Sequence, residues 1–135
     1  MKSMSGRCKA IVFRCIDFRI TLTEFSKILS GMGYPEGTYD LVSCAGAIKS
    51  MATNEDRGFL LKQIEAAKKL HGVTEVLIFQ HDNCGAYGIP SVSEEEGTQK
   101  KHLKEVARII GTAVLVKTFI IQGTKTGTLY IKEIF

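Results

Sequence analysis

Two short apolar runs rich in branched side chains constrain the fold of this sequence most, because each one ends directly at a group of chemically reactive residues. The runs are Ala-Ile-Val-Phe at residues 10–13 and Val-Leu-Ile-Phe at residues 76–79. Short apolar runs of this kind are typical of buried strands. The reactive residues are Cys15, Asp17 and Arg19 after the first run, and His81 and Cys84 after the second. Both groups are therefore expected in loops that leave the ends of buried strands.

Extended and helical patterns alternate along the rest of the chain. Strands are predicted at residues 8–14, 39–43, 74–80, 113–122 and 128–134, and helices at about 22–32, 54–70 and 91–111. Residues 48–54 show no strong period. The second helix is expected to bury one apolar face, made of Phe59, Leu60, Ile64, Ala67 and Leu70.

This alternation predicts an α/β fold with a doubly wound, mostly parallel sheet in the order 2-1-3-4 and helices on both faces. The segment Gly123-Thr-Lys-Thr-Gly127 has hairpin chemistry, so the last strand should be an antiparallel edge. In this order strands 1 and 3 are neighbours, and ligands bind beyond their carboxyl ends. Cys15 would then lie close to His81 and Cys84.

Composition narrows the class of protein. With 135 residues, residues 1–135 are expected to form a single domain. The net charge of +4 is modest and the lysines are scattered, which disfavours nucleic-acid binding. No apolar run is long enough for a membrane span and the N-terminus lacks a signal-peptide core, so a cytoplasmic protein is expected. In that compartment the four cysteines are expected to be metal ligands or reduced thiols.

The thiols of Cys15 and Cys84 and the imidazole of His81 form a donor set that suits zinc, with the fourth position open to water or substrate. Asp17 could close the site as a fourth ligand, giving a structural zinc, or could pair with Arg19 and leave it open. Unrelated buried thiols are a third interpretation. Cys44 is expected to be buried, Cys8 inert, and His71 and His102 exposed at helix ends. Asp82 and Asn83 could orient His81 or be ordinary turn residues.

The pattern Cys15-x-Asp17-x-Arg19 with His81-x-x-Cys84-Gly85 resembles the two signature motifs of the β-class carbonic anhydrases, and the order of elements around them is similar from about Lys9 to Ile134. The resemblance implies a zinc enzyme that interconverts carbon dioxide and bicarbonate by attack of a zinc-bound hydroxide. Cys15, His81 and Cys84 would be the metal ligands, Asp17 and Arg19 the catalytic gating pair, and Ala45, Gly46 and Gly85 substrate-binding positions. It also implies a homodimer or higher homo-oligomer.

This sequence departs from the family at two places. It begins almost directly at the first strand, where members usually carry a helical arm, so it resembles a short, minimal member. Ser43-Cys44 stands where the family commonly has Arg-Asn before the Ala-Gly turn. The alternatives are a carbonyl sulfide or carbon disulfide hydrolase on the same fold, and a non-catalytic zinc-binding homologue. A thiol-redox protein is disfavoured because the sequence has no Cys-x-x-Cys.

Overall fold

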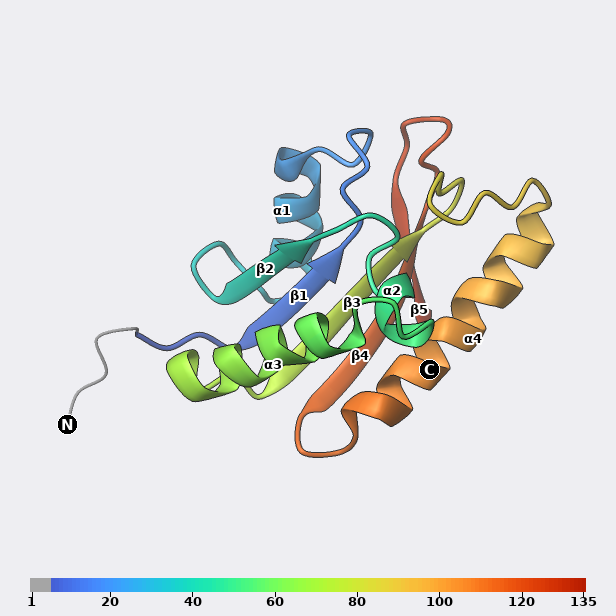
Figure 1. The fold of residues 1–135 in the computed structure, drawn as a ribbon. Coiled ribbons are helices and arrows are strands. Elements are labelled where there is room, and N and C mark those ends of the chain that lie inside the picture. Colours follow the sequence, from blue (N-terminus) through green and yellow to red (C-terminus); the bar gives the residue numbers. More distant parts are fainter. Residues whose placement is uncertain (1–5) are drawn as a thin grey trace.

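The computed structural model describes residues 6–135, and it has one five-stranded sheet in the order β2-β1-β3-β4-β5 (Figure 1). The strands are β1 (Ala10–Arg14), β2 (Tyr39–Ser43), β3 (Glu75–His81), β4 (Leu115–Gln122) and β5 (Tyr130–Ile134). All neighbours are parallel except β4 and β5, which pair antiparallel. The predicted fold class and strand order are confirmed. The expectation about a signal peptide rests mainly on residues 1–5, which lie outside the described residues.

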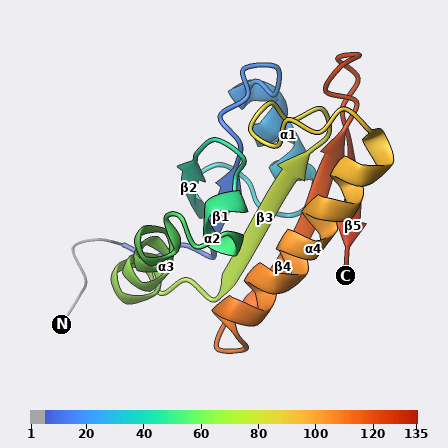
Figure 2. The same cartoon turned by 45° about the vertical axis from the view of Figure 1, so that its right-hand side comes forward.

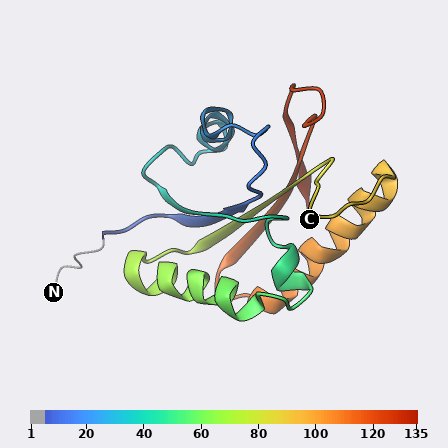
Figure 3. The same cartoon turned by 45° about the horizontal axis from the view of Figure 1, so that its top comes forward.

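Within residues 6–135, four helices cover the two faces of the sheet (Figures 2 and 3). They are α1 (Leu22–Gly31), α2 (Lys49–Ala52), α3 (Arg57–His71) and α4 (Val92–Ile110). Helix α1 packs on one face, and α2, α3 and α4 pack on the other. The side chains of Thr21 and Ser91 cap α1 and α4, each accepting a hydrogen bond from the backbone N–H three residues later.

Alternate residues of the strands supply the two halves of the core. In β1, Ile11 and Phe13 face α3 and α4, whereas Val12 faces α1. Phe79 of β3 lies at the centre of the α1 side, with its ring 5.1 Å from that of Phe25 and 4.8 Å from that of Phe119. All five residues of β1 and all seven of β3 are buried, as is typical of central parallel strands.

Helix α3 corrects two details of the sequence analysis. Leu60, Ile64 and Ala67 are buried as predicted, but Phe59 is 61% exposed and Leu70 is 48% exposed. With 3.6 residues per turn, both lie about a quarter-turn to the side of the buried stripe. The helix begins at Arg57 and not at Asn54, whose φ of 66° is incompatible with a right-handed helix.

Two further features complete the fold. The four-residue helix α2 was not predicted, because a single turn is too short to show a period. The hairpin between β4 and β5 requires glycine at residue 123, where φ is 86° and a Cβ would lie 1.9 Å from the carbonyl oxygen of Thr128. No helix in residues 6–135 combines the length and the apolar character that crossing a membrane requires.

Helix α1 offers a matched test of the core. We expect Leu29→Ala to lower the free energy of unfolding by about 2–5 kcal/mol, because Leu29 is completely buried. Leu22→Ala, on the same helix, should change it by less than about 0.5 kcal/mol, because Leu22 is 71% exposed. Urea unfolding of both variants measures the difference, and equal losses would contradict the packing of α1.

Candidate metal centre

The carboxyl ends of β1 and β3 meet at one edge of the sheet, where the loops that follow them leave side by side (Figure 1). The two strands are parallel neighbours, with Phe13 paired to Ile78. Cys15 follows β1 directly, His81 is the last residue of β3, and Cys84 lies three residues further on. The ligand atoms of Cys15, His81 and Cys84 all lie within 4.8 Å of one another. Residues separated by more than sixty positions thus form one cluster, as the predicted topology requires.

His81 presents a free ring nitrogen to the two thiols. Its Nδ1 is 2.6 Å from the backbone carbonyl oxygen of Asp82, so Nδ1 carries the proton and donates it. Its Nε2 is then an acceptor, and it is buried without any hydrogen-bond partner. A buried nitrogen of this kind normally costs free energy, unless a metal ion takes the lone pair.

The two thiols lie against each other, with their sulfur atoms 4.0 Å apart. An S–H that donates to the other sulfur lowers the pKa of Cys15 and raises the pKa of Cys84. Burial lowers the pKa of His81, but the Cys15 sulfur and Asp17 more than offset it and the net shift is upward. The pair of sulfurs therefore holds one proton tightly, and a divalent cation would displace it.

These donors fit a zinc ion. Two thiolates and one neutral imidazole match zinc's preference for sulfur and nitrogen, and they leave the site formally neutral. Three protein ligands leave a fourth position free, as catalytic zinc sites do.

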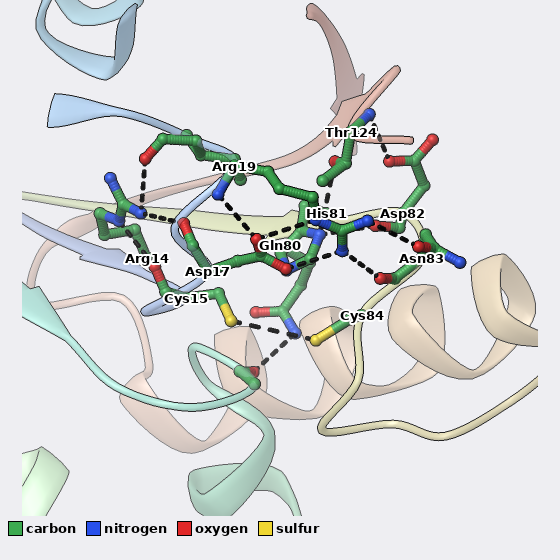
Figure 4. Close-up of polar contacts among 12 residues, drawn as sticks. Arg14, Cys15, Asp17, Arg19, Gln80, His81, Asp82, Asn83, Cys84 and Thr124 are labelled. Atoms are coloured by element: carbon green, nitrogen blue, oxygen red, sulfur yellow. Dashed lines mark hydrogen bonds and ion pairs between the residues drawn. The ribbon is translucent and has the colours of Figure 1, made fainter. Parts of the chain in front are cut away.

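Asp17 lies beside this cluster and is held by Arg19 (Figure 4). Its carboxylate accepts hydrogen bonds from Arg19 Nε at 3.0 Å, from Nη2 at 2.8 Å and from the backbone N–H at 2.9 Å. Asp17 Oδ2 is only 3.6 Å from His81 Nε2, so the carboxylate points at the space in front of the ligands. The Arg19 hydrogen bonds lower the pKa of Asp17 to about 2.

The charge on Asp17 therefore persists throughout the neutral range. Because its folded-state pKa is below the ordinary value of 3.8, the carboxylate stabilises the folded chain above that pH. That contribution is lost as the pH falls from 3.8 towards about 2.

Arg19 also forms hydrogen bonds with the loop that follows β3. Its Nη1 donates to Asn83 Oδ1 and its Nη2 to the Asn83 carbonyl oxygen, both at 2.8 Å. Asp82 accepts hydrogen bonds from the backbone N–H groups of Gly123 and Thr124 at 2.9 and 3.0 Å, which ties the same loop to the hairpin. Asp82 and Asn83 are thus supporting residues and not ordinary turn residues.

Three buried polar residues that the sequence analysis gave no role support the ligands. Arg14 donates to the carbonyl oxygens of Cys15, Asp17 and Ile20 at 2.7, 3.1 and 2.9 Å, which fixes the first loop. Glu95 of α4 accepts from the backbone N–H groups of Asn83 and Cys84 at 2.7 and 2.8 Å.

The third residue, Gln80, links the Ala-Gly turn to the site. It accepts from Ile48 N–H at 3.1 Å and donates to the Gly46 carbonyl oxygen and the Tyr87 hydroxyl, both at 3.0 Å. The available signal for Arg14 and Gln80 was a polar residue directly after four apolar strand residues. Glu95 had no such signal, because it is one of three consecutive glutamates on a helix.

An open cavity of about 480 Å³ lies beside the cluster. It is lined by residues of both loops and of α4, among them Asp17, Arg19, Cys84, Gly85 and Glu95. Of the predicted substrate-binding positions, Gly85 therefore lines this cavity. Gly46 is buried next to Ala86, Ala45 is exposed, and neither lines it. Cys44 is half-buried and its thiol donates to the Ala47 carbonyl oxygen at 3.0 Å, outside the ligand cluster.

The fold is that of the β-carbonic anhydrases. The carbonic anhydrase from Streptococcus mutans superposes with a TM-score of 0.66 at 12% identity, covering 100% of this chain and 86% of that one. A β-carbonic anhydrase from Trichomonas vaginalis superposes with a TM-score of 0.62 at 16% identity, covering 100% and 87% of the two chains.

The sequence assigns the family. The family model described as "Putative carbonic anhydrase" matches residues 5–129, and the chain belongs to this family. An uncharacterized protein of Rickettsia conorii is 31% identical over an alignment of 113 residues that covers 80% of this chain. The chain spans 59% of the length of that relative.

Glu95 provides a test of what fixes the loop after β3, which carries Cys84. We expect Glu95→Gln to weaken zinc binding about tenfold or more, because an amide has one acceptor oxygen, whereas the two carboxylate oxygens accept from two backbone N–H groups. Chelator competition measures the affinity. Glu94→Gln is the matched control, since Glu94 is exposed on the same helix turn. Unchanged affinity in Glu95→Gln would show that the loop holds its shape without this carboxylate.

Proposed function

We propose that this protein is a zinc-dependent carbonic anhydrase that interconverts carbon dioxide and bicarbonate. The observation that carries the proposal is the buried, unpartnered Nε2 of His81, which lies beside two thiols and 3.6 Å from a carboxylate oxygen of Asp17. Membership of the carbonic anhydrase family supports the same reaction.

In this proposal Cys15, His81 and Cys84 hold the metal, and Asp17 and Arg19 control access to it. When bound, zinc would act as a Lewis acid that lowers the pKa of a water molecule towards about 7. The proton of His81 stays on Nδ1, which donates it in a hydrogen bond to the Asp82 carbonyl oxygen, and Nε2 therefore remains available as a ligand.

Arg19 determines what Asp17 can do. Because both carboxylate oxygens accept hydrogen bonds from the guanidinium, Asp17 is held back from the fourth metal position. Its remaining lone pairs can accept a hydrogen bond from the attacking oxygen and orient it towards substrate in the cavity. Asn83 anchors Arg19 from the other loop and so keeps this pair in place.

We expect the zinc-loaded protein to hydrate carbon dioxide, with activity rising from about pH 6 to about pH 9 as the attacking water loses its proton. Asp17→Asn should keep its zinc and lose about 10²-fold or more of the turnover, because the amide no longer accepts the orienting hydrogen bond in the same way. Stopped-flow assays, with zinc content measured on the same samples, check both statements.

Glu65→Gln is the matched amide control, since Glu65 is exposed on α3 and far along the chain from both loops. Loss of zinc from Asp17→Asn would identify Asp17 as a fourth ligand of a closed structural site. Stoichiometric zinc without hydration contradicts the proposal. In that case release of hydrogen sulfide from carbonyl sulfide or carbon disulfide separates a hydrolase from a non-catalytic zinc-binding homologue.

The proposed enzyme acts as a homodimer. Strand β2 is an edge of the sheet with one side unpaired, which is the usual place for association through strands. Beside it, Leu41 and Phe59 line a surface hollow and are 41% and 61% exposed. Exposed apolar side chains next to an open strand edge favour burial against a second copy.

We expect Phe59→Glu to shift the protein from dimer to monomer, because a buried charge at the contact would be unpaired. Light scattering coupled to size-exclusion chromatography measures the mass in solution. Leu22→Glu replaces an apolar residue that is 71% exposed on the helix covering the opposite face, and it should leave the dimer intact. A monomeric wild-type protein, or a dimer that Phe59→Glu does not affect, would exclude this interface.

A further inference from the structure

A second cluster of metal-binding side chains lies at the opposite end of β1. It consists of Cys8, Asp40 and His71, whose ligand atoms all lie within 4.8 Å of one another. The sequence analysis gave Cys8 and His71 no role. The proposed enzyme does not use any of these three residues.

Three separate elements build this cluster. Cys8 lies just before β1, and its backbone N–H donates to the His71 carbonyl oxygen at 3.0 Å. Asp40 lies in β2, opposite Ile11 of β1 in the parallel register. His71 ends α3, and Figure 1 shows this end of the helix beside the start of β1.

The backbone turn after α3 fixes the position of His71. Gly72 caps the helix in the left-handed conformation with φ of 66°. The Arg7 guanidinium packs over it, and a Cβ at residue 72 would lie 2.7 Å from Arg7 Nη2. The histidine therefore directly precedes a left-handed turn that glycine adopts without strain.

The chemistry of the cluster suits a divalent cation. His71 Nδ1 and Asp40 Oδ2 lie 2.7 Å apart, at hydrogen-bond distance, so a small movement apart would let both bind one ion. Thiolate, imidazole and carboxylate are the three side chains that zinc binds most often. All three residues are half-exposed.

A bound ion would have room for water as well. Asp40 and His71 also line a cavity of about 210 Å³ between β2 and α3, so the open side of the cluster can be reached from outside. Among the residues that the structure describes, His71 is the one ion-pair partner of Asp40.

We propose that Cys8, Asp40 and His71 form a second binding site for a divalent cation of the zinc class, separate from the site at Cys15, His81 and Cys84. Cys15 lies seven positions after Cys8 along mostly extended chain, which at about 3.3 Å per residue places the sites roughly 20 Å apart. An ion there would join the start of β1, the edge strand β2 and the end of α3.

The alternative explanation is an ion pair between His71 and Asp40 that ties α3 to β2 without a metal. Such a half-exposed pair contributes at most about 1 kcal/mol and has no need of a thiol. The two explanations differ in whether Cys8 matters for metal content.

Counting zinc per chain tests the proposal. Metal-free protein is dialysed against zinc and analysed by atomic emission. The wild type should hold two ions, because both clusters bind. Cys8→Ser, Asp40→Asn and His71→Gln should each hold one, and Cys44→Ser, which alters another half-buried thiol, should still hold two.

Cobalt provides a readout that does not depend on the first site. In a Cys15→Ser/Cys84→Ser double variant, cobalt should still produce the near-ultraviolet charge-transfer band of a thiolate ligand, which Cys8 would supply. Absence of this band, one zinc ion in the wild type at saturation, or two in Cys8→Ser would overturn the proposal. The double variant separates this result from the proposed enzymatic activity, since it removes two ligands of the first site.

Discussion

The parallel pairing of β1 with β3 is the constraint on which the candidate metal centre depends. The two strands run side by side with Phe13 opposite Ile78, so the residues that leave their carboxyl ends share one small volume. Cys15 comes from one strand and His81 from the other, and neither loop holds a full ligand set. A shift of one residue in this register would turn alternate side chains to the opposite face of the sheet. The complete burial of both strands is what makes such a shift costly.

Buried polar side chains then fix the conformations of the two loops that carry the candidate ligands. Arg14 holds one loop through three carbonyl oxygens, and Glu95 holds the other through two backbone N–H groups. Charged side chains are rarely buried to this extent unless they form several hydrogen bonds. Glu95 also lines the cavity beside the ligands, whereas Arg14 does not. They give the loops a fixed shape before any ion arrives, which reduces the ordering required for binding.

Much of this arrangement could be predicted from the sequence, because it follows from short-range patterns. The apolar runs located the strands, and the alternation with helices defined their order. The side chains of Thr21 and Ser91 cap two of the helices that the sequence predicts. Sequence patterns do not predict contacts that depend on how the elements pack.

Phe59 is apolar, as core residues are, but it lies a quarter-turn from the buried stripe of its helix. Glu95 is a second example, since it differs from Glu94 only in its contacts with the loop that carries Cys84. The proximity of Cys8 to His71 likewise depends on where α3 ends relative to β1, and no local spacing encodes it.

Asp82 makes one contact through its backbone and another through its side chain, and only the second depends on which amino acid stands there. Its backbone carbonyl oxygen fixes the tautomer of His81, and every amino acid provides such an oxygen. Its carboxylate binds the backbone of Gly123 and Thr124 in the hairpin, and few other side chains could do so. The orientation of the histidine is therefore protected against substitution at this position, whereas the attachment of the hairpin is not.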